Sequence, residues 1–232
     1  MLKVNNINQY YGGSHTLRSV SMSVQIGQCI AVLGRNGVGK TTLLQCLMGV
    51  QSIRNGSIEF NDQDISRMPP YQRARLGIAY VPQGREIFSR LTVEENILMG
   101  MATQSSSKAK KIKSDIFELF PVLKTMMNRR GGDLSGGQQQ QLAIARALVS
   151  EPKLIIFDEP TEGIQPSIIK DIGRVIAMLR DQGNMGIVLC EQYFDFAQAL
   201  ADTFIVLSRG EVVASGDHKQ MSDPSVRQLL SV

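Results

Sequence analysis

One eight-residue stretch constrains the fold of this chain more than any other feature. Residues 34–41 read Gly-Arg-Asn-Gly-Val-Gly-Lys-Thr, the G-x-x-x-x-G-K-[ST] pattern of a loop whose backbone N–H groups surround phosphate oxygens. The apolar run Cys29–Leu33 precedes it, and residues 42–48 favour a helix that stops at Gly49. A buried strand, a glycine turn and a helix are the setting in which this pattern binds phosphate.

The residue types in the loop predict separate roles. Lys40 offers a positive charge to the outer phosphates of a nucleotide, and Thr41 offers a hydroxyl to magnesium. The alternative is an ordinary glycine-rich turn, which the flanking segments disfavour. The residues expected to contact the nucleotide are Gly34, Arg35, Asn36, Gly37, Val38, Gly39, Lys40, Thr41 and Thr42.

Size and composition indicate a single α/β domain with a substantial core. The chain has 232 residues, of which 43% are apolar and 20% charged, and a net charge of +4, which is ordinary for a globular protein. Its clearest basic cluster is Lys108, Lys110, Lys111 and Lys113. No aromatic residues are interleaved there, so we expect the solvated start of a helix and no nucleic-acid partner.

The cysteines and the apolar segments bear on the cellular setting. Cys29, Cys46 and Cys190 lie in apolar segments without metal-ligand spacing, so buried reduced thiols are expected. The first residues show no signal-peptide pattern. No apolar stretch approaches the roughly 20 residues of a membrane helix, so any membrane association is expected to depend on partner chains.

Hydrophobic periodicity predicts strands first, then helices, then alternating strands and helices. The first strands are expected at residues 2–7, 19–24, 29–33, 57–60 and 78–81, with a turn at Asn55-Gly56. From about Ser89 helices are expected: one opened by a Thr92–Glu95 capping box, one carrying Ile112, Ile116, Leu119 and Phe120 and ended by Pro121, and one beginning at Ser135. A strand at 154–157, a helix from Pro166, strands at 186–190 and 204–207, a hairpin around Arg209-Gly210 and a short helical tail complete the pattern.

A second motif follows the apolar strand that ends at Phe157. Asp158 and Glu159 stand at its end, where nucleotide chemistry needs one acid to hold magnesium and a second group to act on the attacking water. Asp158 suits the first role and Glu159 the second. The alternative is a helix-capping turn with two solvated acids.

The third motif is Leu134-Ser135-Gly136-Gly137-Gln138. Taken alone, it is a Ser-x-x-Gln capping box with two glycines. Together with the glycine loop, Gln83 and Asp158-Glu159, in this order and spacing, it resembles the ATP-binding subunits of ABC transporters over essentially the whole chain. The resemblance implies an α/β fold: a P-loop core with a mostly parallel sheet, an antiparallel N-terminal β subdomain and a helical subdomain at about 89–150, all within one domain, 1–232.

The resemblance also implies that the cofactors are ATP and Mg²⁺, and it assigns further residues. In this family Ser135, Gly136, Gly137 and Gln138 would contact the γ-phosphate of ATP bound to the opposite subunit. Tyr11 would stack on adenine, although a strand tyrosine also serves in packing. Gln83 would connect magnesium and the attacking water to the membrane partner. The metal-associated residues would be Thr41, Gln83 and Asp158, and the catalytic ones Glu159 and Gln192.

Gln192 is a departure, because the family commonly has histidine at this position. A neutral hydrogen bond is worth about 1 kcal/mol, against roughly 1.5–3 kcal/mol for a charged one. The difference corresponds to about tenfold in rate. Turnover is therefore expected to be slower, not absent.

The stretches Asp158–Ile169 and Glu191–Ala197 are most similar to the smaller ATP-binding subunit of bacterial urea importers. Subunits for branched-chain amino acids or short amides are the alternatives. The resemblance implies a head-to-tail dimer with a second ATP-binding subunit, transmembrane permease subunits and an external solute-binding protein. It places the chain on the cytoplasmic face of the bacterial inner membrane, attached through the permease.

Two rival functions remain from other classes. One is a non-transport ABC ATPase, although such proteins usually carry two such domains in one chain or a long coiled coil. The other is a nucleotide-dependent binding or assembly module without useful hydrolysis, which the glutamine at position 192 keeps open.

Overall fold

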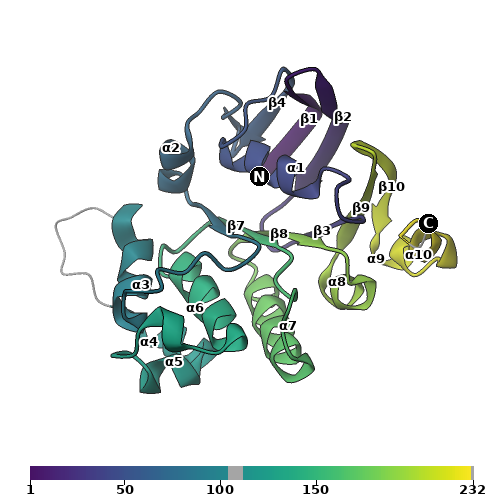
Figure 1. Ribbon diagram of the computed structural model, residues 1–232. Helices are drawn as coiled ribbons and strands as arrows, with labels where there is room; N and C mark the ends of the chain where they lie inside the picture. Colours follow the sequence, from purple (N-terminus) through teal and green to yellow (C-terminus); the bar gives the residue numbers. More distant parts are fainter. Residues whose placement is uncertain (104–111, 231–232) are drawn as a thin grey trace.

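Two sheets form the body of the computed structural model, which describes residues 1–103 and 112–230 (Figure 1). An antiparallel sheet has the order β2-β1-β4-β5, and a larger sheet has the order β10-β9-β3-β8-β7-β6. The strands are β1 (Leu2–Tyr11), β2 (Ser14–Val24), β3 (Cys29–Leu33), β4 (Asn55–Phe60), β5 (Gln63–Asp64), β6 (Ile78–Val81), β7 (Leu154–Asp158), β8 (Gly186–Glu191), β9 (Thr203–Ser208) and β10 (Glu211–Asp217). The expected fold class is confirmed.

The larger sheet brings distant parts of the sequence to one edge. Its neighbouring strands are parallel except for the β9–β10 pair. Strand β8 lies between β3 and β7, with Leu33 opposite Glu191 and Asp158 opposite Cys190. Because the carboxyl ends of parallel strands meet at the same edge, the segments that follow β3, β7 and β8 lie together there.

The larger sheet is buried on both faces, as its apolar strands predict. Along β3, Ile30 and Val32 pack into the core shared with the antiparallel sheet and α1 (Lys40–Met48). Cys29, Ala31 and Leu33 pack into the other core, which includes helices α6 to α8. Figure 1 shows α1 and the antiparallel sheet on one side of the parallel strands, and α6, α7 and α8 on the other.

Three of the helices begin where their local signals predict. Capping boxes open α3 (Val93–Met99) at Thr92 and α6 (Gly136–Leu148) at Ser135. Pro166 begins α7 (Pro166–Asp181), as expected. The other helices are α2 (Pro70–Arg75), α4 (Ser114–Leu119), α5 (Pro121–Thr125), α8 (Phe194–Leu200), α9 (His218–Met221), α10 (Pro224–Gln228) and the 3₁₀ turns η1 (Gly100–Thr103) and η2 (Gly131–Asp133).

The turn expected at Asn55-Gly56 is wrong, because both residues belong to β4. The pairing register between β1 and β4 shifts between Asn5 and Asn8, which marks an irregularity in the ladder. Gly56 has φ +91°, and an added Cβ would lie 2.5 Å from Asn5 O. The Asn55-Gly56 pair therefore lies at a β-bulge and does not form a chain-reversing turn.

The expected helix around Ile112 is also corrected. Ile112 precedes α4, and Pro121 opens a separate helix, α5, because proline is favoured in a first turn. Of the basic cluster, Lys108, Lys110 and Lys111 lie outside the described residues. Lys113 forms an ion pair with Glu151.

The cysteines and the helices can be compared with what the sequence predicts. The three cysteines are buried and free, as predicted. Within residues 1–103 and 112–230, no helix combines the length and apolar character needed to cross a bilayer.

Candidate active site

The glycine loop joins β3 to the first turn of α1. Gly34 has φ +154°, and an added Cβ would lie 2.6 Å from Leu207 O, so no side chain fits there. Gly39 caps α1 at φ +108°, and as a glycine it has no side chain to accept a hydrogen bond from the opening turn. The first N–H groups of α1 are thus not capped by the N-cap residue, which favours an anion at this end of the helix.

Lys40 is buried in this loop and is fully engaged. Its Nζ donates to Gly34 O at 2.8 Å and to Arg35 O at 2.9 Å, and it lies 3.0 Å from Glu159 Oε1. An ammonium group has three donors, so a phosphate oxygen that binds Lys40 must replace one of these three partners. Both side chains of the Lys40–Glu159 pair are only 4% exposed, which strengthens their mutual attraction.

A cavity of about 320 Å³ opens over the loop. Its lining joins the glycine loop to the end of β7 and to the segment after β6. The lining residues are Thr16, Asn36, Gly37, Gly39, Lys40, Thr41, Thr42, Gln83 and Glu159. The structure thus brings six residues of the expected glycine loop, all of those from Asn36 to Thr42 except Val38, together with Gln83 and Glu159, although they are distant in sequence.

Gln83 connects two acidic residues beside this cavity. Its Nε2 donates to Glu162 Oε2 at 2.9 Å and to Glu159 Oε2 at 3.4 Å. Glu159 itself has φ +46°, a left-handed conformation that costs a non-glycine residue about 1 kcal/mol. A bond from Glu159 N to Cys190 O, 3.0 Å long, holds it there.

Asp158 is buried and incompletely satisfied. It is 1% exposed, and Tyr80 Oη donates to its Oδ2 at 2.8 Å. Within the described part of the chain, its buried Oδ1 has no hydrogen-bond partner. Burial raises the pKa of Asp158 above the ordinary carboxyl range. The alternative of two solvated acids at this strand end is therefore wrong.

The residues around Asp158 fit a magnesium ion. A buried carboxylate oxygen without a partner is costly, and a hard cation with oxygen ligands offsets this cost. The side chain of Thr41 lies close enough to Asp158 to affect its pKa. Thr41, Asp158 and Gln83 would hold the ion, while bound phosphate would supply further oxygen ligands.

We predict that Asp158→Asn stabilises the protein against urea at pH 7 in the absence of nucleotide and metal. Because the folded pKa of Asp158 is raised, the native state retains its proton longer than the unfolded chain. Its contribution to the free energy of unfolding therefore falls as pH rises through the carboxyl range. The neutral amide removes this penalty, so the free energy of unfolding at pH 7 should rise. The gain should vanish at acid pH, and a loss of stability at pH 7 would contradict the prediction.

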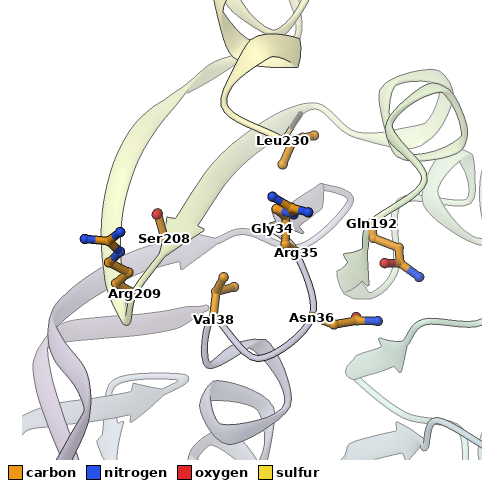
Figure 2. Close-up of a pocket in the computed structure, with 8 residues that line it drawn as sticks. All are labelled: Gly34, Arg35, Asn36, Val38, Gln192, Ser208, Arg209 and Leu230. Carbon is orange, nitrogen blue, oxygen red and sulfur yellow. The ribbon is translucent and has the colours of Figure 1, made fainter. Parts of the chain in front are cut away.

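Gln192 reaches the loop from the end of β8. It lines a second cavity of about 540 Å³ together with Gly34, Arg35, Asn36 and Val38. Figure 2 shows these residues around the cavity, with Ser208, Arg209 and Leu230 on its other sides. Gln192 thus lies beside the glycine loop, where a group acting on a phosphate would have to lie.

Tyr11 lies apart from these two cavities as the structure describes them. The residue is 45% exposed, and its hydroxyl donates to Gln45 Oε1 at 3.3 Å. The alternative that Tyr11 serves in core packing is therefore wrong. Its place beside α1 leaves the adenine-stacking role as a prediction.

Four residues of the third motif, Ser135–Gln138, open α6. Ser135 N donates to Gln138 Oε1 at 2.9 Å and Gln138 N donates to Ser135 Oγ at 3.4 Å, so the capping box is confirmed. The guanidinium of Arg85 lies against Gly136, where an added Cβ would be 3.1 Å from Arg85 Nη1. None of the four motif residues lines either described cavity at the glycine loop.

Three residues at the site were missed by reasoning from the sequence. Tyr80 holds Asp158, Glu162 accepts from Gln83, and Glu191 accepts hydrogen bonds from the turns on either side of it. Glu191 had a usable signal, since it stands at the end of a continuous apolar strand as Asp158 does. Tyr80 and Glu162 had none, because their roles depend on which strands become neighbours.

A phosphate-binding glycine loop with a buried Lys–Glu pair, at the carboxyl edge of a parallel sheet, defines a P-loop nucleotide-hydrolysing enzyme. The sequence pattern described as ABC transporter matches residues 17–162. The chain therefore belongs to the ABC transporter family, as one of its ATP-binding ATPase subunits.

Individual relatives agree with this assignment. The chain is 41% identical over 213 residues to the high-affinity branched-chain amino acid transport ATP-binding protein BraG of Pseudomonas aeruginosa, covering 92% of this chain and 91% of BraG. It is 34% identical over 231 residues to the lipopolysaccharide export system ATP-binding protein LptB of Escherichia coli, covering 98% and 95%. Its fold matches a solved ATP-binding cassette of an ABC transporter with a TM-score of 0.84, 29% identity and coverage of 100% and 98%.

Proposed function

We propose that this chain hydrolyses Mg²⁺-ATP to energise solute uptake through partner permease subunits. The observation that carries the proposal is the Lys40–Glu159 contact at the cavity lined by the glycine loop, with Gln83 bonded to Glu159. The pair joins a phosphate-binding cation to a base at the point where a γ-phosphate would lie. The same contact explains how binding and hydrolysis are linked.

The reaction begins with an exchange of partners. Phosphate oxygens of ATP bind the N–H groups of the glycine loop and take the place of Glu159 at Lys40. Glu159 is then free to accept a proton from the attacking water, while Gln83 orients its carboxylate through Nε2. When bound, magnesium supplies positive charge that offsets the charge developing on the phosphates. Gln192, beside the loop, donates a hydrogen bond to the phosphate that is cleaved.

A second ATP-binding subunit completes each site in this proposal. The Ser135–Gln138 segment does not line the cavities at the chain's own glycine loop. The N–H groups at the start of α6 suit an anion, so we assign them to the ATP of a partner in a head-to-tail dimer. The partner is a related chain or a second copy.

The permease contact is proposed at a groove between the sheet and the α3–α6 helices. This groove, of about 630 Å³, is lined in part by Tyr80, Phe88 and Met99. Phe88 is 44% exposed and Met99 is 47% exposed, an apolar surface of the kind that partner helices cover. The segment that begins at Gln83 ends in this groove, which gives the permease a direct connection to Glu159. The chain would thus lie on the cytoplasmic face of the bacterial inner membrane.

Two solutes are proposed. Urea follows from the resemblance of residues 158–169 and 191–197 to urea-importer subunits, and branched-chain amino acids follow from the name of the relative BraG. An external solute-binding protein would complete either importer. LptB, which is named as part of an export system, makes export the alternative direction.

The deciding experiment reconstitutes the chain with its permease and solute-binding protein in vesicles. We expect ATP hydrolysis to rise severalfold with external urea and to stay at its basal rate with leucine. Stimulation by leucine alone would instead support the branched-chain amino acid assignment. Stimulation by neither solute, in a complex that hydrolyses ATP, would contradict both. Vesicles carrying Glu159→Gln in this chain are the control.

A further inference from the structure

Glu191 is a buried carboxylate between the two segments that carry Glu159 and Gln192. It ends β8, the strand that lies between β3 and β7, and it is 1% exposed. In the register of the sheet it is opposite Leu33, directly before the glycine loop. The glycine loop after β3 and the Asp158-Glu159 segment at the end of β7 therefore follow the two strands that neighbour β8.

Four hydrogen bonds reach its two oxygens from opposite sides. Oε1 accepts from Thr161 Oγ1 at 2.7 Å and from Thr161 N at 3.2 Å. Oε2 accepts from Gln192 N at 3.1 Å and from Tyr193 N at 3.3 Å. Oε1 thus binds Thr161, which lies two residues after Glu159. Oε2 binds the backbone of the turn that carries Gln192.

Burying the Glu191 carboxylate costs free energy because the group loses its contacts with water. Other interactions must therefore stabilise it in this position. Burial raises the pKa of Glu191, and the bonds from Thr161 and Tyr193 oppose the shift. Among the described residues, no lysine or arginine forms an ion pair with it. Hydrogen bonds to a charged group are roughly twice as strong as neutral ones. The charged carboxylate therefore stabilises the relative position of the loop that carries Glu159 and the loop that carries Gln192. The backbone of Glu159 is in a left-handed conformation there.

We propose that Glu191 is a positioning residue for hydrolysis, whose carboxylate fixes Glu159 and Gln192 relative to each other. The inference rests on the proposed function, since it assumes that Glu159 acts on the water. Small displacements of a base are expensive, because the reacting atoms must lie within a few tenths of an ångström of their productive positions. Nucleotide binding depends on the glycine loop and not on these bonds, so Glu191 should affect kcat and leave the KM for ATP unchanged.

The test compares variants on both sides of the bridge. Glu191→Gln keeps the shape but replaces one acceptor oxygen by a donor, and Thr161→Val removes the 2.7 Å bond without a change in size. We expect each to lower kcat about tenfold or more, with the KM for ATP within twofold of the original. Thr161→Ser keeps the hydroxyl, so its kcat should lie within threefold of that of the unmodified protein. If Glu191→Gln fails to fold, Thr161→Val carries the test.

Asn96→Ala separates positioning from stability. Asn96 is also fully buried and makes four hydrogen bonds to backbone atoms, but it lies in α3, away from the glycine loop. It should lower Tm and leave kcat unchanged. The inference is overturned if Glu191→Gln and Thr161→Val lower only Tm, or raise KM at constant kcat. Glu159→Gln is assayed beside them: normal turnover in that variant would overturn the proposed function itself, whatever Glu191 does.

Discussion

Replacing Glu159 by glutamine should lower the rate of ATP hydrolysis by about two to four orders of magnitude, the usual contribution of a positioned base. Glutamine has nearly the same shape but cannot accept a proton from water. ATP binding should persist and even tighten, because the neutral amide competes less strongly than the carboxylate for Lys40, its partner at 3.0 Å. Phosphate release and equilibrium binding of ATP, measured on the same samples, test both parts.

The matched control is Glu211→Gln, a change of the same type on the exposed β9–β10 hairpin, where Glu211 pairs with Arg18 at 3.9 Å. It should leave hydrolysis and binding unchanged. Hydrolysis by Glu159→Gln within threefold of the unmodified protein would contradict the role of Glu159. Phosphate release at background level from both proteins would instead favour a nucleotide-dependent assembly module over a transport ATPase.

The sequence could predict the elements of this site that are encoded locally. The glycine loop, the apolar strand before it and the acids after Phe157 are each readable within about ten residues. Both capping boxes, at Thr92 and Ser135, follow from side chains three residues apart. In these cases the physical cause and the sequence signal lie in the same segment.

Contacts between segments could not be predicted in the same way. Tyr80 lies in the interior of β6, and only the pairing of β6 with β7 brings its hydroxyl to Asp158. The Asn55-Gly56 pair has the same local preference in a turn as in a bulge, and the neighbouring strand β1 decides between them. Glu191, a buried acid at the end of β8, has a local signal of its own, but its partner Thr161 lies 30 residues away and becomes its neighbour only in the folded sheet.

The second large effect concerns the start of α6. Ser135→Asp should nearly abolish hydrolysis, because a carboxylate there repels the γ-phosphate of the partner's ATP. Two unit charges about 4 Å apart interact by roughly 4 kcal/mol at an effective dielectric constant of 20, which corresponds to about a thousandfold in rate. Aspartate is as good an N-cap as serine, so α6 should remain folded. Ser135→Asn, which caps the helix equally well without a charge, is the control. Its rate of ATP hydrolysis should fall far less.

Mixing two inactive variants then shows whether this helix acts across a dimer. Lys40→Ala disables the chain's own glycine loop, and Ser135→Asp disables the face that it offers to a partner. In a mixed pair one site is doubly defective, but the other combines an intact loop with an intact Ser135 segment. Pairs co-purified through two different tags should therefore recover up to half of the normal rate, although neither variant hydrolyses ATP alone. Mixed pairs as inactive as the separate variants would show that Ser135 acts within its own chain, because in that case neither site would be intact.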